Sequence, residues 1–306
     1  NSSIMARRQH LMEAAGRIDP LAHLAARPAV AEIEAIGRVL TLAEWTGARV
    51  HIAHHSAADS LFVLRAAKQR GVDVTVETCP QYLLLNTTDM LRLGGILRLN
   101  PPIREERHNQ PLWDALMDGT IDMIATDHAP HSPEEKTRES IWQCDCGFPG
   151  VETQMPLMLT EVNRQRATLM DYVKWSAVAP AKAWGLYGTK GVLAVGAHAD
   201  IAVVDMDRRA VLSQGRLQSI SKISPWNGRA VQGVPVHTLV RGRFVMRDSR
   251  LVAEAAGWGQ SVKSVQRMPS PKPRNTEHYS SQILRTPAGV PPTAVPTDPA
   301  ALEGAA

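Results

Sequence analysis

The sequence predicts an α/β fold in which helices cover a parallel sheet, arranged either as a barrel or as a doubly wound sheet. Two observations support this prediction. Along the first 190 residues, segments with helical periodicity alternate with short strands that are too apolar to have one face in water. From Gly191 onward, short strands joined by glycine and aspartate turns indicate a small all-β unit.

The first elements follow from residue spacing. The segment "PAVAEIEAIGRVLTLAEWTG" (28–47) repeats apolar residues near the helical period and closes on a glycine suited to a C-cap. "ARVHIAHHS" (48–56) then predicts a strand, and "ADSLFVLRAAKQRG" (58–71) a helix that ends at a second glycine. "VDVTVETCP" (72–80) predicts the next strand.

The later elements continue the pattern. We expect a helix at 109–119, an apolar strand at 121–126, and helices at 168–186 that break near Pro180. The residues after 268 are rich in Pro, Ser, Thr and Ala and poor in apolar side chains, which predicts a disordered tail.

Composition narrows the class of protein. With 44% hydrophobic and 21% charged residues, the chain of 306 residues can build a sizeable core. The net charge of +4 comes from scattered arginines, so we expect no nucleic-acid partner. Three cysteines without C-x-x-C spacing and the lack of a bilayer-length apolar run predict a reduced cytoplasmic compartment and no membrane partner.

Two predicted strands end in residues that can bind metal. "VHIAHHS" ends in His54 and His55, and "MIATDHAPH" continues into Asp127, His128 and His131. Because the C-terminal ends of parallel strands converge on one face of the sheet, these side chains are expected to meet there. Imidazole and carboxylate suit zinc or a similar ion. A structural histidine or a helix-capping aspartate would give the same residues at these positions.

Strand alternation favours one of these histidines as the ligand. His51 and His55 share a side of an extended strand, whereas His54 points to the opposite side. His54 also lies nearest the end of the strand while still within it. We therefore expect His54 to bind metal and His55 to face the packing layer.

Six segments, in this order, resemble the cyclic amidohydrolases: "HIAHHS", "ETCPQYLLL", "NPPIREE", "ATDHAPH", "GFPGVET" and "GVLAVGAHADIAVVD". That group includes dihydroorotase, allantoinase, hydantoinase and dihydropyrimidinase, and the resemblance runs to about residue 263. It implies the C-terminal part of a TIM-like (β/α)8 barrel at 1–190 and part of a small β-sandwich at 191–267, followed by the disordered tail at 268–306. The chain looks like an N-terminally truncated member that retains barrel strands 6 to 8.

The resemblance also implies roles for particular residues. His54 matches a metal-ligating histidine, and Asp127 matches the catalytic aspartate that binds metal and transfers the proton. The family centre holds two metal ions, usually zinc, although other divalent metals are possible. His128 is expected to support the site from behind. Cys144 and Cys146 are not expected to bind metal, because their C-x-C spacing lacks a second pair.

The expected substrate is a small cyclic amide or ureide, opened by hydrolysis or closed in reverse. Asn100 and His131 match the dihydroorotase pattern, and Cys146 and Gly147 are expected to contact the substrate ring through their backbone. Because "ETCPQYLLL" resembles the hydantoinase and dihydropyrimidinase branch, that activity and allantoinase activity stay open as alternatives. A further alternative is a non-catalytic homologue that acts as an assembly partner.

Two further expectations concern the molecule as a whole. A homo-oligomer is expected. Three barrel strands cannot close a barrel and two ligands bind metal weakly, so the chain alone is expected to be inactive.

Overall fold

The computed structural model describes residues 1–263. Its helices are α1 (Ser2–Ala14), α2 (Pro20–Ala26), α3 (Ala29–Thr46), α4 (Leu61–Gln69), α5 (Pro80–Leu84), α6 (Thr87–Leu93), α7 (Asn109–Asp118), α8 (Pro133–Lys136), α9 (Val151–Asn163), α10 (Leu169–Val173) and α11 (Ala179–Ala183). Its strands are β1 (Val50–Ile52), β2 (Val74–Thr78), β3 (Met123–Ile124), β4 (Ile201–Val211), β5 (Ala230–Val240), β6 (Arg243–Arg247) and β7 (Arg250–Leu251). The predicted tail at 268–306 lies outside the described residues.

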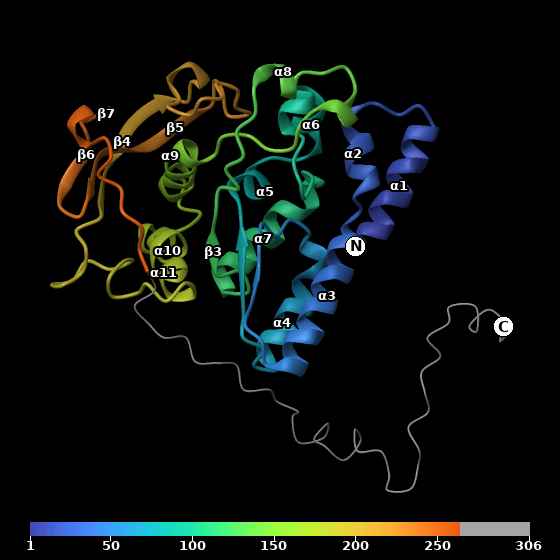
Figure 1. The fold of residues 1–306 in the computed structure, drawn as a ribbon, viewed down its shortest axis with the longest axis horizontal. Helices are drawn as coiled ribbons and strands as arrows, with labels where there is room; N and C mark the ends of the chain where they lie inside the picture. The colour runs from blue at the N-terminus through green and yellow to red at the C-terminus, as the bar shows by residue number, and fades with distance from the viewer. Residues whose placement is uncertain (264–306) are drawn as a thin grey trace, which may run out of the picture.

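A parallel sheet of three strands lies at the centre of the fold, in the order β1-β2-β3 (Figure 1). Val50 pairs with Val74 at the start of β1, and Thr78 pairs with Ile124 at the end of β3. Helices lie between successive strands in the chain, as parallel connections require. The predicted α/β class with a parallel sheet is therefore confirmed.

The two faces of the central strand β2 differ in character. Val74 and Val76 are buried in the main apolar cluster with Leu64, Leu112 and other side chains of α4 and α7. Thr75 and Glu77 alternate with them and are only partly buried. Since successive side chains of a strand point to opposite faces, Glu77 lies on the face that turns away from this core.

The helices that precede the strands end where the sequence indicated. Gly47 ends α3 and Gly119 ends α7, with φ of 71° and 79°. Left-handed φ costs glycine little, and this conformation lets the chain turn out of a helix into the following strand. These two glycines set the points at which the chain turns toward β1 and β3.

The expected break near Pro180 is not a break. The segment Lys174–Val178 forms a π-helical stretch that joins α10 to α11 without interruption. Pro180 lies at the start of α11, directly after the π-helical stretch, and that irregular turn lets the helix continue past a residue that has no N–H to donate. The irregularity therefore precedes the proline.

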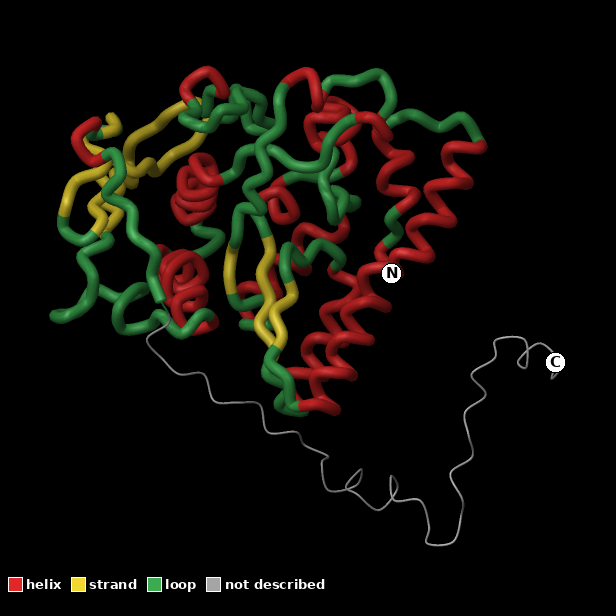
Figure 2. The backbone as a smooth tube through the Cα atoms, viewed as in Figure 1, coloured by secondary structure: helices red, strands yellow, loops and turns green. Residues whose placement is uncertain are grey.

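The second sheet is antiparallel, in the order β4-β5-β6-β7, and stands apart from the parallel sheet (Figure 2). Its first two strands have 11 residues each, longer than the short strands that the sequence suggested. The sheet packs on α9, where Thr160 Oγ1 accepts the Gln232 N–H at 2.9 Å and Asn163 Nδ2 donates to the Met206 carbonyl at 2.8 Å. Within residues 1–263, no helix has both the length and the apolar character that crossing a bilayer demands.

Candidate active site

Both predicted ligands lie just beyond their strands. β1 ends at Ile52 and β3 at Ile124, so the expectation that His54 is within the strand is wrong. His54 has φ of 40° and Asp127 has φ of 51°. Alternation stops applying where the backbone leaves the extended conformation, so the direction of these side chains is set by the left-handed turn instead.

The structure brings His54 and Asp127 close together across the end of β2. Burial raises the pKa of Asp127, the charge of His54 opposes that rise, and the nearby Glu77 adds to it. His54 Nδ1 is buried and has no hydrogen-bond partner among the described residues. A buried imidazole nitrogen left without a partner, next to a half-buried carboxylate, fits a metal ion better than a hydrogen-bonded structural histidine.

Glu77 is a site residue that the sequence reasoning missed. Its Oε1 accepts the His54 backbone N–H at 3.3 Å, and its Oε2 lies 3.1 Å from His51 Nε2. His51 Nδ1 is in turn 2.8 Å from Thr75 Oγ1. Alternation in "VTVET" already puts Thr75 and Glu77 on one face, but the register that brings His51 beside them could not be read from one strand.

A carboxylate with a side chain only 13% exposed fixes the loop that follows His54. Glu32 of α3 accepts the backbone N–H groups of Ser56 at 2.9 Å and Ala57 at 3.1 Å, and Arg104 Nη2 lies 3.0 Å from its other oxygen. Burial opposes ionisation of Glu32, but nearby His55 and Arg104 and the hydrogen bonds from Ser56 outweigh it and lower the pKa to about 2. The position of His54 therefore depends on a contact with α3.

His55 packs against α3 and is not part of the candidate metal site. Its side chain is buried, and its Nδ1 lies 3.4 Å from Glu32. Burial lowers the pKa of His55, and the nearby Glu32 carboxylate opposes that shift. This agrees with the expected packing role.

His128 forms a backbone contact. Its Nδ1 accepts the N–H groups of Gly150 at 3.1 Å and Val151 at 3.2 Å, at the start of α9. Because the first N–H groups of a helix have no partner within it, this ring caps α9 and ties it to the loop after β3. His128 thus supports the loop that carries Asp127.

The residues predicted to contact substrate form one cluster. Asn100 Nδ2 donates to Cys146 Sγ at 3.4 Å, and His131 Nε2 is 3.1 Å from the Cys146 carbonyl. The Gly147 N–H, however, donates to the Arg98 carbonyl at 2.9 Å. The Gly147 N–H therefore joins its loop to that of Asn100, and the Cys146 carbonyl is already in contact with His131, so the substrate roles stay predictions.

Lys136 also joins the loop of Asn100 to the loop of Cys146. Its ammonium is fully buried and donates to the carbonyls of Arg98 at 2.9 Å and Asp145 at 2.6 Å. Burial lowers the pKa of Lys136 to about 8. The loops that carry Asn100 and Cys146 are thus held by a charge with no access to water.

Another group could in principle hold a metal. Single ligand atoms of His131, Glu135 and Asp145 lie within 4.8 Å of one another, the only such group of three within residues 1–263. Glu135 Oε2 already accepts the Ser132 N–H at 2.8 Å in the capping box of α8. Ordinary helix capping and the contacts of His131 account for this group, and no cysteine belongs to it.

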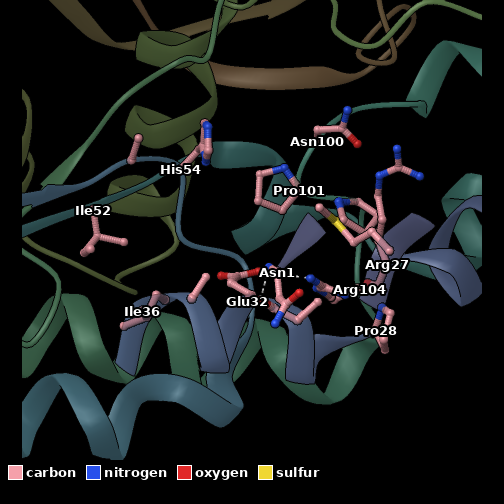
Figure 3. Close-up of a pocket in the computed structure, with 15 residues that line it drawn as sticks. Asn1, Arg27, Pro28, Glu32, Ile36, Ile52, His54, Asn100, Pro101 and Arg104 are labelled. Carbon is pink, nitrogen blue, oxygen red and sulfur yellow. Dashed lines mark hydrogen bonds and ion pairs between the residues drawn. The ribbon is translucent and has the colours of Figure 1, made fainter. Parts of the chain in front are cut away.

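A cavity of about 390 Å³ lies beside the site (Figure 3), and neither Asp127 nor His131 is among the residues that line it. It runs along β1 between α3 and the loop that begins at Asn100, and both His54 and Asn100 line it. Figure 3 shows Arg27 on the same side of the cavity as Asn100. Arg27 Nη1 lies 3.2 Å from His23 Nδ1. Burial lowers the pKa of the Arg27 guanidinium.

Comparison with known proteins gives consistent matches. The model of the amidohydrolase family matches residues 10–245. The L-hydantoinase of Paenarthrobacter aurescens is 37% identical over 265 residues, covering 86% of this chain and 58% of that protein. The dihydroorotase of Bacillus caldolyticus is 40% identical over 224 residues, covering 73% and 52%.

Other relatives and solved structures agree. The allantoinase of Rubrobacter xylanophilus is 36% identical over 77% of this chain and 52% of its own length. The solved L-hydantoinase from Arthrobacter aurescens superposes with a TM-score of 0.80 at 36% identity, covering 82% of this chain and 56% of that one. The chain therefore spans a little over half the length of the proteins that it matches.

Proposed function

Because the chain belongs to the amidohydrolase family, we propose that the protein containing it is a metal-dependent hydrolase of cyclic amides. Its parallel strands and their helices are the C-terminal part of the TIM-like barrel of that family. The observation that carries the proposal is the meeting of His54 and Asp127 at the ends of the strands on either side of β2.

The donor set suits a divalent metal, and zinc is the first choice. A buried imidazole nitrogen without a partner and a carboxylate are ligands that zinc accepts readily. When bound, the metal would polarise the substrate carbonyl and activate the attacking water. Two protein ligands hold zinc weakly, so we infer that groups outside the described residues complete a centre, binuclear as in the family.

Asp127 is proposed to move the proton. Attack of water on the ring carbonyl releases a proton, and cleavage of the carbon–nitrogen bond leaves a nitrogen that must gain one. A single carboxylate beside both atoms can accept the first proton and donate it in the second step.

The substrate proposed first is a cyclic ureide that bears a carboxylate, such as dihydroorotate. Asn100 and His131 lie together beside Cys146, and Arg27 lines the cavity with Asn100. An amide can bond the donors and acceptors of the ring, and imidazole and guanidinium side chains suit a carboxylate. An uncharged hydantoin is the alternative, because relatives named hydantoinase match more of the chain than the dihydroorotases do.

The test compares the complete protein with the 306-residue chain on dihydroorotate, hydantoin and allantoin. We expect hydrolysis by the complete protein and none by the chain alone. Asp127→Asn should lower kcat by about 100-fold or more. Asp145→Asn is the matched control, because Asp145 belongs to the other candidate metal group. Loss of zinc in Asp145→Asn but not in Asp127→Asn would move the centre to that group.

A protein of another class would behave differently. A non-catalytic assembly partner should hydrolyse none of the three substrates and bind no zinc, and this result would refute the proposed activity. We further propose that the complete protein is a homo-oligomer. Sedimentation velocity would test this. The free thiols of Cys79, Cys144 and Cys146 are in keeping with a reducing cytoplasm.

A further inference from the structure

Both oxygens of the Glu77 carboxylate are committed to neighbours at the site. Oε1 accepts the backbone N–H of His54, and Oε2 contacts His51 Nε2. The side chain of Glu77 is 18% exposed and that of His51 is 23% exposed. His51 is held in turn by Thr75 Oγ1 and by the edge-on ring of Trp184, with centroids 4.7 Å apart. These contacts place one neighbour beside each oxygen of the carboxylate.

The place of Glu77 in the sheet explains what it can do. β2 is the central strand, and the chain segments that carry His54 and Asp127 follow the strands on its two sides. Glu77 lies on the face opposite to the apolar core, next to the ends of those strands. The Glu77 carboxylate is therefore near the proposed centre. It also accepts a hydrogen bond from the backbone N–H of His54, which lies just beyond the end of β1.

His54 needs such support. A non-glycine residue at φ of 40° is in a sparsely populated conformation, so neighbouring contacts must hold it. The bond from the His54 N–H to Glu77 is one of those contacts, and a nearby anion also strengthens the binding of a cation. Core packing does not require a carboxylate at this position.

We propose that Glu77 is a positioning residue for the metal centre: it fixes the main chain of His54 through one oxygen and is itself held by His51 through the other. This inference rests on the proposed function, because it takes His54 to be a metal ligand. Residues that orient metal ligands typically change metal affinity by about 10 to 100-fold when they are removed. Glu77 should therefore affect zinc binding more than it affects folding.

The experiment uses the complete protein with the variants Glu77→Gln, Glu77→Ala and Glu161→Gln. Glu161 is the matched control, because it is a buried glutamate of α9 that pairs with Arg164 away from the site. Three quantities are measured: the zinc dissociation constant by chelator competition, kcat and KM on the best substrate, and the thermal midpoint of the metal-free protein.

We expect Glu77→Ala to weaken zinc binding by about 10-fold or more and to lower kcat with little change in KM. Glu77→Gln keeps an oxygen for the His54 N–H, so it should recover part of the zinc affinity. Glu161→Gln should lower the thermal midpoint and leave the zinc dissociation constant unchanged.

The outcomes separate the two proposals. If Glu77→Ala binds zinc like the unaltered protein, the positioning role is refuted, whatever happens to the thermal midpoint. If the unaltered protein hydrolyses no cyclic amide but its zinc affinity still depends on Glu77, the proposed activity fails and the positioning role stands. A protein that binds no zinc at all overturns both.

Discussion

Replacing Glu32 by glutamine should destabilise the fold through the loop that carries His54. The change removes the charge opposite Arg104, whose side chain is only 4% exposed. Breaking a buried ion pair by neutralising one partner typically costs about 3–5 kcal/mol. The pKa leads to a similar figure, because a fall from 4.5 to about 2 corresponds to roughly 3 kcal/mol of stability at neutral pH.

The sign of the pH effect follows from the direction of the shift. Since the folded pKa of Glu32 lies below its unfolded value, the contribution is complete above the unfolded pKa of 4.5 and is lost as pH falls toward 2. The Glu32→Gln variant should therefore be less stable than the unaltered protein near neutral pH. The difference between the two should shrink on acidification.

The assay is urea unfolding followed by far-ultraviolet circular dichroism at neutral and acidic pH. Glu34→Gln is the control on the same helix: Glu34 contacts Arg38 and Asn1 near the surface, so its loss should matter little. A Glu32→Gln protein within about 1 kcal/mol of the unaltered protein at neutral pH would refute the reasoning, since ordinary substitutions cost that much.

Two further predictions concern the loops around Asn100. Between pH 8 and 10.5 the unfolded chain binds a proton at Lys136 that the folded chain lacks, so the stability of the unaltered protein should rise with pH by up to about 3 kcal/mol. Lys136→Met should remove this rise. Equal pH slopes of the urea midpoint in the two proteins would contradict this prediction. Gly147→Ala should lower the thermal midpoint, because Gly147 has φ of 123° and a new Cβ would stand 2.5 Å from the Cβ of Ala129. Gly37→Ala in α3 is the control: its new Cβ meets nothing within 4 Å, so this variant should raise the thermal midpoint. Equal thermal midpoints for Gly147→Ala and Gly37→Ala would contradict this prediction.

The regular elements could be predicted because their signals are local. The glycines that end α3 and α7 and the apolar alternation of β2 each lie within a few residues of the feature that they determine. The π-helical stretch before Pro180 could not be read in the same way. It depends on how a continuous helix packs, and proline is equally compatible with a break and with a first turn.

The candidate site was only partly predictable, for a related reason. His54 and Asp127 could be named from short motifs, but the argument that put His54 within a strand failed, because β1 ends two residues earlier. The contact of Glu32 with Ser56 joins residues 24 positions apart, and that of Glu77 with His51 depends on strand register. A single sequence gives neither the register nor the packing of a helix on a loop.

The backbone at the two proposed ligands shows why these contacts matter to function. His54 and Asp127 both have positive φ, a conformation that costs a residue with a side chain about 1 kcal/mol or more. Contacts with the surrounding structure must offset that cost: Glu77 bonds the His54 N–H, Glu32 fixes the loop after it, and His128 ties the loop after Asp127 to α9. A variant that loosens the contact of Glu77 or of His128 lets its ligand relax while the core clusters of α4 and α7 stay packed, whereas Glu32→Gln also lowers global stability. Metal affinity should therefore fall before global stability does, which is the order of events that separates a strained site from an ordinary loop.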